Sequence, residues 1–168
     1  MSVLGLKSFG LALSLLLLLL VPASVTAEER DYKSSDQSLT LHSNEEFDTT
    51  FNPHAILALQ TPDKIIVLVT TRPKEYTTKR IYDGAPFSFP EGTECTGRVL
   101  LSVDGEEAPT FLVEGMFPPD EAPTHSTLYT IVNHGDTEYT IMIHYPIEME
   151  QEGFEWAADC LNHFTWEN

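Results

Sequence analysis

The sequence predicts an α+β domain, an antiparallel β-sheet with a C-terminal amphipathic helix packed on one face. Two observations support this fold class. Short runs rich in β-branched residues are separated by turn residues over most of the chain, which is typical of antiparallel strands. Near the C-terminus, apolar residues return at helical spacing and predict one buried helix face, formed by Phe154, Ala157, Ala158, Leu161 and Phe164.

The first 27 residues have the pattern of an export signal. Lys7 supplies a positive charge, residues 11–21 are almost all apolar, and Val25-Thr26-Ala27 offers small residues for cleavage. The alternative is a transmembrane anchor, but the apolar run is about half of the ~20 residues that a spanning helix needs. We therefore expect a cleaved signal peptide at 1–27, no transmembrane anchor after cleavage, and an exported protein, periplasmic or extracellular.

The rest of the chain has the size and composition of one acidic domain. The 168 residues contain 26 Asp and Glu and 9 Lys and Arg, so the formal charge is −17, or −18 without Lys7. This charge repels nucleic acid and anionic membranes, and it indicates either a solvated acidic surface or a basic partner. Residues 28–37 are polar and predict a flexible leader, and 38–168 predict a single α+β domain.

The predicted strands are joined by recognisable turns. Pro62-Asp63, Asp104-Gly105 and His134-Gly135-Asp136 each lie between two apolar runs and predict β-hairpins. The second strand of the last hairpin alternates, and this alternation predicts one face directed toward the core. The expected strands cover residues 38–42, 54–60, 65–71, 98–103, 110–116, 127–133 and 137–144.

A basic and aromatic segment interrupts the acidic chain between the first and second hairpins. Residues 74–82 are a candidate short helix, and 83–97 are a Gly- and Pro-rich loop that is either ordered or a flap facing a ligand. The aromatic side chains either cap the core or present an apolar patch beside the positive charge. The candidate partner-binding residues are Arg72, Lys79, Arg80, Tyr82, Phe87 and Phe89.

The chain has two cysteines, Cys95 and Cys160. In an oxidising compartment an even pair favours one disulfide, and a loop of this length could contribute on the order of 4 kcal/mol to stability. The alternative is two separate buried thiols. A cysteine nucleophile is not expected, because neither position has a neighbouring base in the sequence.

The sequence holds no signature of catalysis or of a metal site. Gly-x-Ser-x-Gly and Gly-rich phosphate loops are absent, and the acids beside turns are typical of a solvated surface. The 6 histidines are scattered without the close spacing of zinc ligands. We therefore expect no enzymatic activity, no cofactor and no bound metal.

The order of elements resembles the PsbP-like α/β/α sandwich family. The similarity covers most of residues 38–166 and rests on three segments. These are the early hairpin Ala55–Thr71, the strand–turn–strand unit Leu128–Tyr145, and the helix that ends Cys-Leu-Asn-His-Phe. The resemblance implies a PsbP-like sandwich. It also implies an accessory or binding role, because members of the family mostly lack enzymatic activity and bind proteins or assist complexes.

We expect an exported, non-enzymatic accessory or binding protein. It would hold a protein partner through the Arg72–Arg80 segment and the Tyr82–Phe89 loop. One alternative is a carrier of a small molecule or lipid, which needs an apolar cavity of ~300 Å³ or more between sheet and helix. Another is a small secreted hydrolase, which needs a histidine within hydrogen-bond reach of an acid and a nucleophile in one cleft.

Overall fold

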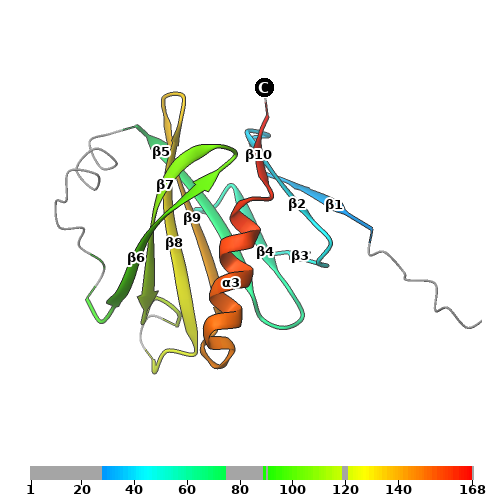
Figure 1. Cartoon of the computed structure of the whole chain (residues 1–168). Coiled ribbons are helices and arrows are strands. Elements are labelled where there is room, and N and C mark those ends of the chain that lie inside the picture. Colours follow the sequence, from blue (N-terminus) through cyan, green and yellow to red (C-terminus); the bar gives the residue numbers. More distant parts are fainter. Residues whose placement is uncertain (1–27, 75–88, 90, 119–120, 168) are drawn as a thin grey trace, which may run out of the picture.

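The computed structural model describes residues 28–74, 89, 91–118 and 121–167. Within these residues the strands form one sheet of seven strands and one of three (Figure 1). In chain order the elements are β1 (Arg30–Lys33), β2 (Leu39–Ser43), β3 (Asp48–Thr49), β4 (Leu57–Gln60), β5 (Ile66–Pro73), β6 (Glu94–Val103), β7 (Glu106–Glu114), β8 (His125–His134), β9 (Thr137–Pro146), η2 (Ile147–Met149), α3 (Glu150–Leu161) and β10 (Phe164–Trp166).

The larger sheet is antiparallel throughout and has the strand order β3-β4-β5-β9-β8-β7-β6. All three predicted hairpins are present as β4–β5, β6–β7 and β8–β9. The β6–β7 turn consists of Asp104 and Gly105, whose φ angles are 46° and 81°. These positive φ values are those of the tight turns that suit two-residue hairpins, which explains why the Asp-Gly dipeptide marks the turn.

The helix α3 covers one face of the larger sheet (Figure 1). Four alternate residues of β9 point into the core under it, and they are Tyr139, Ile141, Ile143 and Tyr145. From the helix, Ala157 and Leu161 are fully buried in the same core. The predicted α+β class, an antiparallel sheet with a C-terminal helix packed on it, is therefore confirmed.

The smaller sheet was not predicted, and it has the order β1-β2-β10. Arg30–Lys33 lie in the expected flexible leader, but they pair with β2 from Arg30↔Ser43 to Lys33↔Thr40. The expectation of a flexible leader is wrong for these residues. β1 is mostly exposed, so its polar sequence suits an edge strand as well as a leader.

The helix ends earlier than its apolar spacing predicts. It stops at Leu161, and Phe164 belongs to β10, where it pairs with Leu41 of β2. Phe164 is still fully buried in the main core. The apolar spacing therefore predicts the burial of Phe164 correctly, but it predicts a helix where the structure has a strand.

Several expectations fall on residues that the structure does not describe. They are the signal peptide at 1–27, most of the candidate helix at 74–82 and part of the loop at 83–97. Strand β6 begins inside that expected loop, at Glu94 rather than at residue 98. Among the described residues, no helix has both the length and the apolar character needed to cross a membrane.

The contact between α3 and β9 leaves no room for a side chain at Gly153. A Cβ there would overlap the ring of Tyr145 and come within 2.9 Å of the Cβ of Met149. Because Tyr145 is only 2% exposed, its ring cannot move away without disturbing the core.

Gly153→Ala should therefore destabilise the protein, although Gly→Ala normally stabilises a helix by about 1 kcal/mol. We expect a loss of about 1–3 kcal/mol from overpacking, measured by urea unfolding. Gln151→Ala, at an exposed position of the same helix, is the matched control. A Gly153→Ala protein as stable as the control would show that the close contact does not constrain the helix.

Candidate functional site

The candidate partner-binding residues are only partly described. Lys79, Arg80, Tyr82 and Phe87 lie outside the described residues. Arg72 and Phe89, which flank this segment, are described. Arg72 and Phe89 therefore show where the two ends of the segment lie on the sheet.

Arg72 lies near the end of β5, directly across from Glu138 on β9. Its guanidinium forms an ion pair with the Glu138 carboxylate, which is fully buried, while Arg72 itself is half-exposed. A buried carboxylate that loses its cationic partner is costly. Arg72 therefore has a structural role in addition to any role in binding.

Phe89 packs edge-on against two aromatic rings, Phe111 at 5.6 Å and Tyr129 at 5.5 Å between ring centroids. These rings belong to a second apolar cluster, whose strand residues alternate with those of the main core. The cluster therefore lies on the sheet face opposite α3. Phe89 caps this face, and both ends of the basic and aromatic segment are attached to it.

The predicted disulfide between Cys95 and Cys160 is wrong, because both thiols are free. Cys95 is exposed at the start of β6, whereas the part of β6 that borders the C-terminal end of α3 begins at Leu100. Five residues of strand separate these positions by roughly 17 Å, and the Cα atoms of a disulfide must lie within ~7 Å.

Burial raises the pKa of the Cys160 thiol to about 12, so this thiol is protonated and unreactive at neutral pH.

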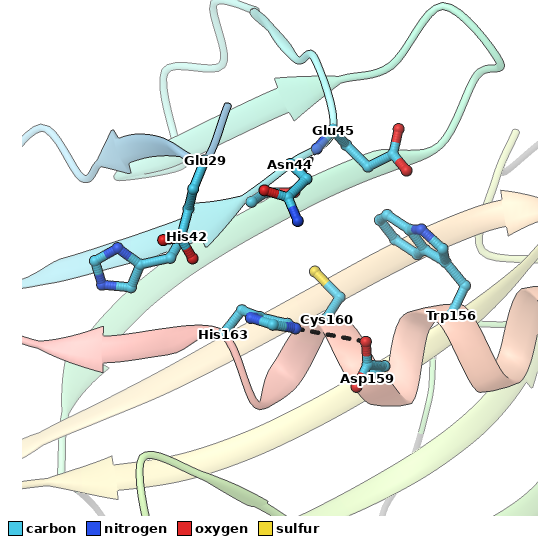
Figure 2. Close-up of a pocket in the computed structure, with 9 residues that line it drawn as sticks. Glu29, His42, Asn44, Glu45, Trp156, Asp159, Cys160 and His163 are labelled. Atoms are coloured by element: carbon cyan, nitrogen blue, oxygen red, sulfur yellow. Dashed lines mark hydrogen bonds and ion pairs between the residues drawn. The ribbon is translucent and has the colours of Figure 1, made fainter. Parts of the chain in front are cut away.

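A cavity of about 140 Å³ opens between β2 and the C-terminal half of α3 (Figure 2). Figure 2 shows the Cys160 sulfur pointing into this space, with Asp159 and His163 joined at 3.5 Å on one side. The lining is mixed in charge and mostly polar. It consists of Glu29, His42, Ser43, Asn44, Glu45, Trp156, Asp159, Cys160 and His163.

At the rim of this cavity, His42 connects an acid and a hydroxyl group. Its Nδ1 lies 2.7 Å from Oδ1 of Asp31 on β1, and its Nε2 lies 2.9 Å from Oγ1 of Thr165 on β10. A carboxylate at Nδ1 favours the tautomer protonated there, so that Nε2 accepts a hydrogen bond from the threonine hydroxyl. This order of groups is that of an acid–base–nucleophile triad.

The triad-like row lies on the outer face of the smaller sheet and not inside the cavity. Asp31 and His42 are respectively 57% and 32% exposed, and of the three residues only His42 lines the cavity. Local sequence patterns did not predict this row, because Asp31 and Thr165 lie on β1 and β10, two strands that were not expected. Among the described residues, no group of three His, Cys, Asp or Glu side chains could hold a metal ion.

A second pair of histidines is buried on the sheet face opposite α3. His144 donates to or accepts from Thr127 Oγ1 at 2.8 Å, and Phe117 packs between its ring and that of His125 at 5.4 and 4.9 Å. Desolvation, with a smaller contribution from the nearby His125, lowers the pKa of His144 to about 4. His144 is therefore neutral at physiological pH.

Comparison with solved structures identifies the architecture. The solution structure of cyanobacterial PsbP (CyanoP) from Synechocystis sp. PCC 6803 matches with a TM-score of 0.56, over 86% of this chain and 96% of that chain. The fold is PsbP-like. The two sequences are 8% identical, so the likeness is one of fold. No protein-family model matches the chain, and no curated protein matches its sequence.

The buried state of His144 predicts a pH dependence of stability. Because its pKa falls on folding from 6.5 to about 4, its contribution is present above pH 6.5 and is lost as the pH falls toward 4. Between pH 7 and pH 4 the wild-type protein should lose about 3 kcal/mol more than His144→Asn, whose amide can still bond Thr127.

Urea unfolding of both proteins at each pH measures this difference. The comparison removes the acid destabilisation that both share through their carboxylates. Equal losses in the two proteins would contradict the assignment of a neutral, buried His144.

Proposed function

We propose that this protein is an exported, non-enzymatic accessory protein that binds a protein partner. The observation that carries the proposal is the PsbP-like fold, which extends over 96% of the CyanoP chain. The resemblance of the sequence to the PsbP-like family implies an accessory or binding role. The formal charge of −17 favours a basic partner, because opposite charge accelerates and orients the encounter.

Export rests on the signal sequence at 1–27. The first strand begins at Arg30, shortly after the predicted cleavage at Ala27, so cleavage there would leave every described strand intact. This close spacing supports 1–27 as a removable segment. The periplasm or the extracellular space is the proposed location.

The proposed binding surface is the basic and aromatic segment between Arg72 and Phe89. Both ends of this segment lie on the sheet face opposite α3, where Arg72 pairs with Glu138 and Phe89 contacts Phe111 and Tyr129. These two described residues give the segment ends on one sheet face, and its sequence adds positive charge and aromatic groups to an acidic protein. The carrier alternative needs an apolar cavity, whereas two openings beside the C-terminal end of α3 among the described residues have charged groups in their lining, Asp159 in both and Glu107 in the larger one.

Replacing both Phe87 and Phe89 with Ala should reduce capture of the partner at least tenfold, if these rings carry the contact. Capture is measured by crosslinking in cells, purification and mass spectrometry. Phe51→Ala is the matched control, because Phe51 is 93% exposed and lies outside the segment. Phe87→Ala alone separates binding from stability, since Phe89 also packs on the sheet.

Unchanged capture by the double variant, with the fold intact, would eliminate this binding surface. Arg72 is unsuitable for the same test, because its loss would remove the ion pair of the buried Glu138. A partner captured through other residues would leave the accessory role in place.

A hydrolase is the second candidate function, and the Asp31–His42–Thr165 row is the observation that favours it. Under the accessory proposal, the wild-type protein should hydrolyse an activated aryl ester no faster than Thr165→Val, because an exposed imidazole accounts for any turnover. The release of the chromogenic phenol measures the rate. Hydrolysis that falls at least a hundredfold in Thr165→Val, and equally in His42→Gln, would instead establish a nucleophilic threonine.

A further inference from the structure

Two adjoining grooves lie between α3 and the segment that follows β2. The first is the cavity of about 140 Å³ in Figure 2, and the second, of about 350 Å³, extends to Met149 at the start of α3. Glu45 and Trp156 line both grooves, so the two meet at these residues. The two together are referred to as the Trp156 groove.

The ionisable side chains that line the Trp156 groove are acids and histidines, and neither part of its lining includes a Lys or an Arg. The acids are Glu29, Glu45, Glu46, Asp63 and Asp159. Glu46 already pairs with Arg30 at 3.1 Å. Among the described residues the carboxylate of Glu45 has no ion-pair partner, and that of Asp159 has only His163, at 3.5 Å. Such a lining attracts a cationic group.

Cys160 provides a second observation, which does not depend on the acids. This residue is only 6% exposed, and Figure 2 shows its sulfur directed into the groove. Its thiol is free and has no hydrogen-bond partner among the described residues. A thiol sulfur is a weak acceptor, so this buried atom is available to an N–H group that enters the groove.

Trp156 gives the groove an aromatic wall. Its half-buried ring packs on Phe47, with the ring centroids 6.4 Å apart. Figure 2 shows the indole rising from α3 toward the segment that carries Asn44 and Glu45. An aromatic face beside carboxylates binds organic cations. A guanidinium suits this site better than an ammonium, because it is planar, stacks on aromatic rings and donates two parallel N–H bonds to a carboxylate.

The second part of the groove indicates that the cation belongs to a longer molecule. Beside Trp156 it is lined by three apolar side chains, which are Pro62, Ile65 and Met149. A small free cation would occupy the first part and leave these side chains in water. A protein segment in which an apolar residue is next to an Arg would cover both parts of the groove.

We propose that the Trp156 groove binds an Arg side chain of the basic partner protein, together with an apolar residue beside that Arg. The guanidinium would stack on the indole and pair with Glu45 and Asp159, and the apolar residue would pack on Met149. The inference rests on the proposed accessory function, because it assigns the chemistry by which the partner is held. The groove is distinct from the Arg72–Phe89 segment, whose ends lie on the sheet face opposite α3.

The probe is a short, capped peptide in which Arg alternates with Leu, and its neutral counterpart has citrulline in place of each Arg. Both are added to the protein purified from cells in the form in which it accumulates. Anisotropy of the dye-labelled peptides measures affinity. Tryptophan emission with the unlabelled peptide locates binding, because the only other tryptophan of the chain, Trp166, is stacked on His134 outside the groove. Trp156→Phe should abolish the change in emission.

We expect the citrulline peptide to bind at least about tenfold more weakly than the Arg peptide. Glu45→Gln combined with Asp159→Asn should weaken binding of the Arg peptide about fivefold or more. The matched control combines Glu94→Gln with Asp136→Asn, which removes the same charge at two exposed positions outside the groove. Its affinity should change less than about twofold, because these charges are screened from the peptide. Thermal unfolding confirms that both double variants are folded.

Four results would overturn the proposal. Equal affinity for the two peptides would show that the groove does not recognise a cation. Equal losses in the two double variants would show that net charge, and not the groove, attracts the peptide. A change in emission that persists in Trp156→Phe would place the peptide elsewhere. Displacement of the peptide by spermidine at a concentration below the dissociation constant of the peptide would make a free polyamine the occupant.

These results separate the Trp156 groove from the general accessory role. A partner that crosslinks in cells only through the Arg72–Phe89 segment would overturn the groove proposal and leave the accessory role standing. A peptide that binds in the groove as expected, with no protein captured in cells, would support the groove as a site for cationic segments and contradict the accessory role.

Discussion

The close packing of α3 on β9 is the constraint on which the rest of the structure depends. Gly153 lets the helix approach the ring of Tyr145, and Ala157 and Leu161 then close the core. The direction of the helix sets where the chain leaves it. After Leu161 the chain turns into β10, which pairs with β2 and completes the smaller sheet. The cavity in Figure 2 and the His42 contacts both follow from this path.

The local parts of this fold could be predicted from the sequence, and its non-local parts could not. The dipeptide Asp104-Gly105 predicts a turn, and the alternation around Ile141 and Ile143 predicts the buried face of a strand. Both predictions succeed because the residues involved are neighbours in the chain. β1 and β10 are short, and their partner is strand β2, which lies far from β10 in sequence. β10 also depends on the core under α3, because its residue Phe164 is buried there.

The same division applies to the candidate sites. The contrast of charge and aromatic content identified the segment flanked by Arg72 and Phe89, and the structure attaches both flanking residues to one face of the sheet. The predicted disulfide failed because cysteine count carries no information on distance. The His42 row depends on which strands are neighbours, and strand order cannot be deduced from any local sequence pattern.

The pairing of β10 with β2 determines when the domain can complete its folding. Strand β10 follows every other described strand in the chain, so the smaller sheet cannot close until the chain is available as far as β10. For a chain that is exported, as we propose, this topology delays completion of the domain. A chain threaded through a translocation channel would keep β2 unpaired on its β10 side until β10 emerges. The fold thus favours passage as an extended chain and assembly on the far side.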